Sequence, residues 1–347
     1  MLEIAYTEGK KVVEPDERFK HVMAIALDSR TNYREGVIRC ITSRDGDIAM
    51  KGTVDRSELH KISGDSLGHF KIGDKLKIKK EKEIIDELAG ENRDLLGLED
   101  PDIWIDEKNN LTHLYFTLPV ITLDKNLKKI GKTKVHLGHA LGKDLDSLEM
   151  TKPVLIGTYD NSAKEVSIAP LNTKGFRFNL IESRDRRTST TYSTVRIAVA
   201  KNMNGPWEYG ETIYHPADHK FPWIAGHASP GPLFSKKFID IGGNKLVGVI
   251  NGCEADQKIG EDTKYGNFSI GLFVYDYENG KIDWVSPEPF IQDSEAGKDG
   301  GRAITFASQF IDTGKGEGIL YAHVDDSFVR SYTLNAEGIR KLLPTNF

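Results

Sequence analysis

Short runs of apolar residues, separated by turn residues, dominate this sequence. The runs are rich in Val, Ile, Leu, Phe and Tyr, and Gly, Asp and Asn lie between them. Few segments keep the periodicity of an amphipathic helix, so the pattern predicts an all-β protein with many short strands. The helix that we expect covers Glu81–Leu88, within a charged connection at about 75–95 between two sheets.

The expected strands fall into five groups of three or four. The first group covers 22–27, 36–42 and 47–54. The other groups begin with runs at 102–105, 166–171, 231–234 and 304–311, and the fifth ends with a short closing run at 338–343. Repeated small antiparallel sheets at a spacing of roughly 60–70 residues indicate a β-propeller. We therefore predict a five-bladed β-propeller that occupies residues 1–347 as one domain. A β-sandwich followed by a second β domain is the alternative, and it explains the spacing less well.

Composition narrows the class of protein. The chain has 347 residues and a net charge of −5, which argues against nucleic acid as its main partner. Cys40 and Cys253 show no metal-binding spacing and are expected to be buried thiols in a reducing compartment. We find no signal-peptide pattern and no apolar run of about 20 residues. We expect a cytoplasmic protein without a membrane partner, metal or cofactor; a homo-oligomer stays open.

One acidic stretch stands out, at residues 97–106. Glu99, Asp100 and Asp102 lie beside Pro101 and directly before the apolar residues of a predicted strand. Carboxylates next to a buried strand cost desolvation energy unless they are paired or used in chemistry. A simple turn is the alternative, because Asp and Pro are common turn residues.

Several motifs resemble glycoside hydrolase family 130, which holds β-mannoside phosphorylases and related hydrolases. Residues 99–103 (EDPDI) resemble the Glu-Asp-Pro-Arg-Ile motif of that family. Residues 227–234, followed by the strand at 245–252, resemble its Gly/Pro-rich turn and the strand that ends in Tyr-His-Gly. Residues 269–277, 286–291 and 319–327 resemble later strands. The resemblance covers roughly residues 20–340, and it implies a five-bladed propeller that acts on an oligosaccharide or glycoside.

The resemblance also implies catalytic roles. Asp100 matches the general acid of the family, which works through a sugar hydroxyl. Glu182 aligns near an arginine that binds phosphate, Asn251 replaces the histidine of Tyr-His-Gly, and Asp102 replaces the arginine of the motif. These changes weaken an anion site, and a carboxylate suits the activation of water. We therefore expect a hydrolase with Asp100 as acid and Glu182 as base.

Two other functions stay open. The segment 182–192 contains Arg184, Arg186 and Arg187, which could hold phosphate in a phosphorylase, line a solvated loop or form a lid. Glu182 could equally form a salt bridge with one of these arginines. A carbohydrate-binding propeller without catalysis is the third possibility, because fold does not imply function.

The remaining candidates are polar or aromatic residues expected near the axis of the propeller. His227 could bond a sugar hydroxyl or hold a turn, and the loop residue Trp223 could stack on a sugar, whereas Trp104 and Trp284 are expected in the core. His136 and His139 lie three apart in a strand, so they point to opposite faces and form no metal pair. The expected substrate-binding residues are Glu99, Asp102, Arg39, Arg184, Trp223, His227, Asn251, Asp325 and Asp326.

Overall fold

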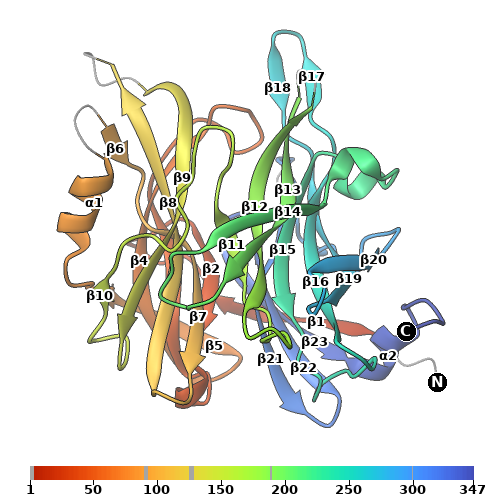
Figure 1. The fold of residues 1–347 in the computed structure, drawn as a ribbon. Helices are drawn as coiled ribbons and strands as arrows, with labels where there is room; N and C mark the ends of the chain where they lie inside the picture. Colours follow the sequence, from red (N-terminus) through yellow and green to blue (C-terminus); the bar gives the residue numbers. More distant parts are fainter. Residues whose placement is uncertain (1–3, 90–92, 125–128, 188–189, 299) are drawn as a thin grey trace.

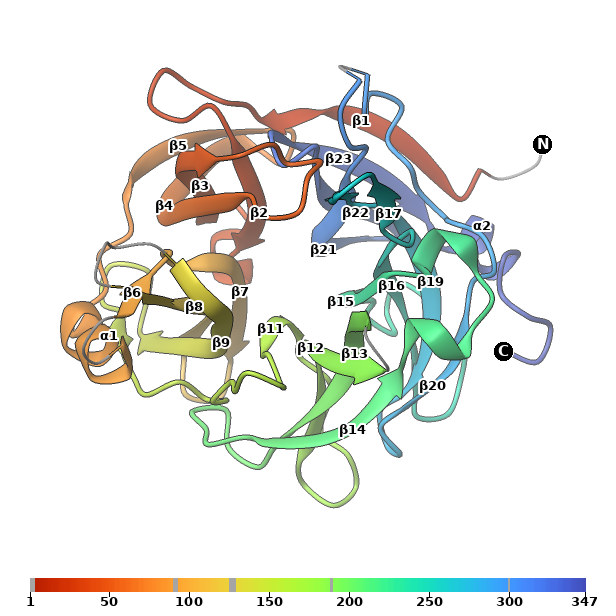
Figure 2. The same cartoon turned by 90° about the horizontal axis from the view of Figure 1, so that it is seen from above.

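The computed structural model describes residues 4–89, 93–124, 129–187, 190–298 and 300–347. The strands form five antiparallel blades around a common axis (Figure 2), and a single parallel bridge joins blades 3 and 4 into one sheet. Blade 1 contains β2 (Val22–Leu27), β3 (Glu35–Asp45), β4 (Val54–Ser66) and β5 (His69–Lys75). Blade 2 contains β7 (Glu99–Asp106), β8 (Leu111–Leu123), β9 (Lys129–Gly142) and β10 (Glu149–Met150), and β6 (Arg93–Leu95) also pairs with β8.

The other three blades follow the same plan. Blade 3 contains β11 (Lys164–Ser167), β12 (Arg177–Arg187), β13 (Thr190–Ala200) and β14 (Glu208–Tyr214). Blade 4 contains β15 (His227–Leu233), β16 (Lys245–Cys253), β19 (Phe268–Asp276) and β20 (Lys281–Val285). Blade 5 contains β21 (Thr305–Gly314), β22 (Glu317–Val324), β23 (Phe328–Asn335) and, as its outer strand, β1 (Tyr6–Val13). The predicted five-bladed propeller is confirmed.

The ring closes through the N-terminal strand, which the sequence analysis did not assign. Strand β1 pairs antiparallel with β23, so the first and last parts of the chain share one blade (Figure 1). The closing run expected at 338–343 is wrong, because Ala336–Arg340 forms the short helix α2. The Asn335 side chain caps this helix by accepting a hydrogen bond from the Gly338 amide.

The first blade also differs from its expected outline. The predicted strand at 47–54 is wrong, because most of that segment forms the loop between β3 and β4. The predicted helix is confirmed as α1 (Glu81–Ala89), which buries Ile84 and Ala89. Residues 90–92 of the charged connection lie outside the described residues. No helix in the described ranges is long and apolar enough to cross a membrane.

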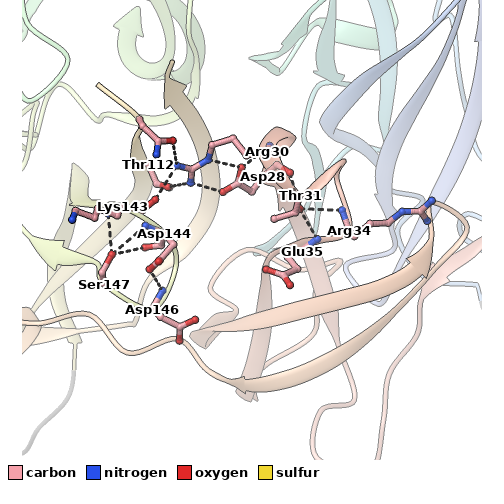
Figure 3. A network of polar contacts seen from close by, with 11 residues as sticks. Asp28, Arg30, Thr31, Arg34, Glu35, Thr112, Lys143, Asp144, Asp146 and Ser147 are labelled. Carbon is pink, nitrogen blue, oxygen red and sulfur yellow. Dashed lines mark hydrogen bonds and ion pairs between the residues drawn. The ribbon is translucent and has the colours of Figure 1, made fainter. Parts of the chain in front are cut away.

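A polar network joins blades 1 and 2 at the end of β2 (Figure 3). Asp28 caps the 3-10 helix η1 (Ser29–Thr31) and is almost fully buried. Its carboxylate pairs with Arg30 at 2.6 Å, and Arg30 also donates to Thr112 and to the Lys143 carbonyl of blade 2. The buried carboxylate is therefore satisfied within the network, which fixes one blade against the next.

A hairpin from blade 4 crosses to blade 1. Strands β17 (Gln257–Ile259) and β18 (Asp262–Lys264) form this hairpin, and it bonds the β3–β4 loop. The Lys51 amide donates to the Thr263 carbonyl, and the Tyr265 amide donates to the Ala49 carbonyl, both at 2.9 Å. The contact places Lys51 and Tyr265 in the wall of one cleft. Two more 3-10 helices, η2 (Pro216–Asp218) and η3 (Pro222–Ile224), precede β15.

Candidate active site

Every inner strand has an irregularity where it faces the axis. Strand pairing shifts register within each of them, at 23–25, 99–102, 164–167, 230–233 and 307–309. In the first three strands a residue other than glycine adopts positive φ: Ala24 (51°), Asp100 (47°) and Glu165 (52°). This conformation costs about 1 kcal/mol or more, and a bulge re-aims side chains. The bulges thus bring two carboxyls, from blades 2 and 3, to the axial pocket.

Arg39 of β3 holds the two acids at the start of β7. Its guanidinium lies 2.7 Å from the Asp100 carboxylate and 2.9 Å from Glu99, and its Nε donates to the Ser57 hydroxyl at 2.9 Å. The Asp100 and Arg39 side chains are only 7% and 11% exposed. Pairing with Arg39 keeps Asp100 ionised, whereas burial raises the pKa of Glu99 to about 7 in spite of Arg39. Arg39, predicted only as a residue near the axis, thus lies directly beside Asp100.

Asp100 and Glu165 form a hydrogen-bonded carboxyl pair. Burial favours the neutral form of Asp100, but Arg39 and Lys164 outweigh it and lower the Asp100 pKa. Burial and the neighbouring Asp100 charge raise the pKa of Glu165 well above its usual range. The pair therefore holds one proton between its two carboxyls. Glu165 is the protonated partner, and Asp100 is the ionised one. A carboxyl that stays protonated at neutral pH is suited to donate a proton.

Below the pair lies an axial pocket of about 160 Å³. Its charged lining residues are all acids, namely Asp100, Asp102 and Glu165. Burial raises the pKa of Asp102 to about 7, and its carboxylate has no salt bridge within the described part of the chain. The described residues contain no group of three or more acidic, His or Cys side chains that could hold a metal ion.

Glu182 of β12 lies in a second cluster between blades 3 and 4. Its carboxylate is 3.0 Å from His227 Nε2 and 3.3 Å from Lys164 Nζ, and it also bonds Ser193. A single parallel bridge between β13 and β15 sets Ser193 beside His227. Burial opposes ionisation of Glu182, but His227 and Lys164 outweigh it, so its pKa is lowered. Glu182 is therefore an ionised anchor with few free acceptor sites.

A cleft of about 970 Å³ opens beside this cluster. Its charged lining consists of six Lys or Arg residues against three Asp residues, with His227 in addition. The positive residues are Lys51, Lys164, Arg184, Arg186, Arg196 and Arg302. The predicted Arg184 and His227 thus share one cleft. Residues 188–189, in the segment considered as a lid, lie outside the described residues.

The two acids at the end of β22 have different surroundings. Asp326 is 3.2 Å from His323, and although burial opposes ionisation, His323 and Arg39 lower its pKa to about 2. It therefore lies near the Arg39 cluster, as expected for an axial residue. Asp325 instead accepts the amides of Gly297 (2.9 Å) and Ile304 (2.8 Å). This geometry closes a loop and leaves Asp325 poorly placed to bind sugar.

Two predicted sugar contacts need correction. Trp223 is only 6% exposed and packs in the core of blade 4, where Gly252 and Gly271 leave room for its ring. Asn251 is fully buried, and its amide bonds both the N–H and the carbonyl of Ala307 on β21. Trp223 is therefore no platform for a sugar, and Asn251 joins two blades. Trp104 is half-buried and lines the axial pocket.

The sequence analysis missed Lys164 and Glu165. A usable signal was present, because this charged pair stands directly before the predicted strand at 166–171, as Glu99 and Asp100 stand at the start of β7. Strand β11 in fact begins at Lys164 and includes both residues. His136 and His139 follow expectation: His136 accepts the Gly157 amide, whereas His139 bonds His113 on the neighbouring strand.

No protein-family model matches this sequence, and no curated protein matches it. Solved structures do. One is a family 130 protein described with glycoside hydrolases that target β-1,2-mannosidic linkages in Candida mannan: 14% identity, TM-score 0.62, covering 96% of this chain and 86% of that one. Another is a β-1,2-mannobiose phosphorylase from Listeria innocua in complex with β-1,2-mannobiose. It has 13% identity and a TM-score of 0.58, and the match covers 99% of this chain and 94% of that one. A third is a mannose phosphorylase from Leishmania mexicana in complex with a phosphate ion. It has 12% identity and a TM-score of 0.54, and the match covers 97% of this chain and 91% of that one. These likenesses confirm the fold expected from the family 130 motifs.

Proposed function

We propose that this protein cleaves the glycosidic bond of a β-mannoside or a closely related glycoside by hydrolysis. The observation that carries the proposal is the hydrogen-bonded pair of Asp100 and Glu165 at two neighbouring bulges. Cleavage needs a proton for the leaving oxygen, and a carboxyl pair that shares one proton supplies it. Structures of the same fold include proteins described as mannoside hydrolases and phosphorylases, which agrees with this substrate class.

The roles within the pair differ from those expected from sequence. Glu165 carries the proton, and Asp100 keeps it there by its negative charge, with Arg39 fixing Asp100 in place. In the reaction the bond from the anomeric carbon to the leaving oxygen breaks. The leaving oxygen takes the proton of the pair, and a water oxygen bonds the anomeric carbon. We therefore assign the predicted acid function of Asp100 to the pair as a unit.

The water must lose a proton to a base. Glu182 fits this role less well than expected, because Lys164, His227 and Ser193 occupy its oxygens and its pKa is lowered. Asp102 lines the axial pocket with Glu165, and its pKa of about 7 is near the optimum for proton transfer at neutral pH. We propose Asp102 as the base, with Glu182 as the residue that positions Lys164 and His227.

Phosphorolysis is the second candidate function. It is favoured by the cations of the cleft, because arginine pairs with phosphate oxygens in a bidentate manner. In this reaction phosphate replaces water, and no base is needed to activate it.

Product analysis tests both functions. The protein is incubated with β-1,2-mannobiose, with and without inorganic phosphate, and free mannose and mannose 1-phosphate are quantified. Mannose formed at equal rates in both samples supports hydrolysis. Mannose 1-phosphate as the main product in the sample with phosphate would reject hydrolysis and show phosphorolysis instead. If binding is measured by calorimetry but neither product forms from any β-mannoside, the protein is a carbohydrate-binding propeller.

A further inference from the structure

The cleft beside the Glu182 cluster contains cations whose charge is not neutralised by carboxylates. Within the described ranges Arg184, Arg196, Arg302 and Lys51 form no salt bridge with Asp or Glu. The lining has six Lys or Arg residues against three Asp residues, and this excess of positive charge around a concave site attracts anions.

Neutral partners hold the three guanidinium groups in place. Arg184 donates to the Thr133 carbonyl at 3.0 Å, and Arg196 donates to the Gly210 carbonyl at 2.7 Å and to Asn161 at 2.6 Å. These bonds fix the orientation of each arginine without cancelling its charge. The cost of ordering the side chains has therefore been met before a ligand arrives.

Arg302 is held by a backbone carbonyl and two aromatic rings. Its Nε donates to the Gly266 carbonyl at 2.6 Å, and its guanidinium lies 4.7 Å from the ring centres of both Tyr265 and Phe268. The hairpin that crosses to blade 1 brings Tyr265 there, together with Lys51. The cleft is thus assembled from segments of blades 1, 3, 4 and 5.

The size of the cleft indicates more than a single small ion. A volume of about 970 Å³ lies at the upper end of the range for organic ligands. The cleft also adjoins the axial carboxyls, because Lys164 lines the cleft and the next residue, Glu165, lines the axial pocket.

We propose that this cleft binds a phosphate ester carried by the substrate on its leaving-group side, so that the preferred ligand is a phosphorylated sugar. The proposal rests on the proposed function, because it takes the axial carboxyls as the point of bond cleavage. The sugar ring whose anomeric carbon reacts lies at the acidic axial pocket. The phosphorylated leaving group lies among Arg184, Arg302 and Lys51.

Calorimetric titration tests the proposal with three probes: mannose, mannose 6-phosphate and inorganic phosphate. Each is measured at low salt and again with added sodium chloride. We expect mannose 6-phosphate to bind at least about tenfold more tightly than either other probe, because it combines a sugar contact with charge-assisted bonds. Added salt should reduce this preference, since part of the attraction is screened.

Variants locate the site. R302Q is expected to weaken the affinity for mannose 6-phosphate by about tenfold or more, and to change the affinity for mannose by less than about twofold. K51Q should act in the same direction with a smaller effect, and because Lys51 is exposed it carries little risk to folding. K237Q, at an exposed lysine outside the cleft lining, is the matched control and should change nothing.

Three results overturn the proposal. They are equal affinity for inorganic phosphate and mannose 6-phosphate, no preference for the phosphorylated sugar over mannose, or equal loss in K237Q and R302Q. Cleavage of neutral mannobiose without any preference for the phosphorylated sugar would reject this inference and keep the proposed function. Tight binding of mannose 6-phosphate without cleavage of any glycoside would reject the proposed function.

Discussion

Two neighbouring regions of this propeller have opposite charge. The axial pocket is small, and its charged lining residues are the carboxyls of Asp100, Asp102 and Glu165. The cleft is several times larger and has twice as many Lys and Arg residues as Asp residues. Lys164 and Glu165 are consecutive in β11, yet one lines the cleft and the other the pocket.

The difference separates two tasks. In the acidic pocket burial raises the pKa of both Glu165 and Asp102, and the neighbouring Asp100 charge raises the Glu165 pKa further, so Glu165 holds a proton at neutral pH. In the cleft Lys164 and His227 keep Glu182 ionised, and the arginines stay available for anions. Proton transfer in the acidic pocket and anion recognition in the basic cleft therefore use separate groups of residues, so the opposite charges of the two sites do not neutralise one another.

The largest effect is expected for E165Q. Glutamine keeps the size of the side chain but removes the proton donor, so kcat for a β-mannoside should fall by about 100-fold or more with KM nearly unchanged. Initial rates measure this. E208Q, at an exposed glutamate of the outer strand β14, is the control. If E165Q retains full kcat, the acidic pocket is not the place of proton transfer.

Replacing Arg39 tests what holds the acidic pocket together. R39M leaves Glu99 and Asp100 buried without their cation, which should lower the free energy of unfolding by about 3–5 kcal/mol. Urea denaturation at pH 7 measures the change. The matched control is R56M, because Arg56 pairs with Asp94 at the surface and should cost less than about 1 kcal/mol. Equal costs in the two variants would contradict our account of the Arg39 cluster.

The third effect concerns Asp102 and depends on pH. Its pKa is about 7 in the folded protein and about 3.9 in an unfolded chain, so between these values the folded state holds a proton that the unfolded state has released. The contribution of Asp102 to stability thus falls as pH rises from 4 to 7. D102N, which stays neutral, should match the wild type near pH 4 and exceed its free energy of unfolding by about 4 kcal/mol at pH 8.

Urea denaturation of wild type and D102N at a series of pH values measures this difference. The exposed residue Asp65 provides the control, since D65N should show no such dependence. A constant difference between D102N and wild type across the series would show that Asp102 titrates alike in both states. It would then be no candidate for the base.

Sequence reasoning predicted local features well. The boundaries of β2 and the helix α1 follow from apolar runs and their period, which depend on neighbouring residues. The same reasoning failed for Trp223, whose loop position suggested exposure, because burial of its ring depends on Gly252 and Gly271 in two other strands. It also missed β1 as the closing strand, since pairing with β23 joins segments more than 300 residues apart.

The sequence by itself determined the repeated short strands, the five blades and an acidic stretch at the start of the second blade. Only the tertiary structure decided which charges meet. Glu182 faces Lys164 and His227 instead of its neighbouring arginines, and Asp100 faces Glu165 across two blades. The physical reason is that strand periodicity is local, whereas a pKa depends on burial and on charges that only the closed ring brings together.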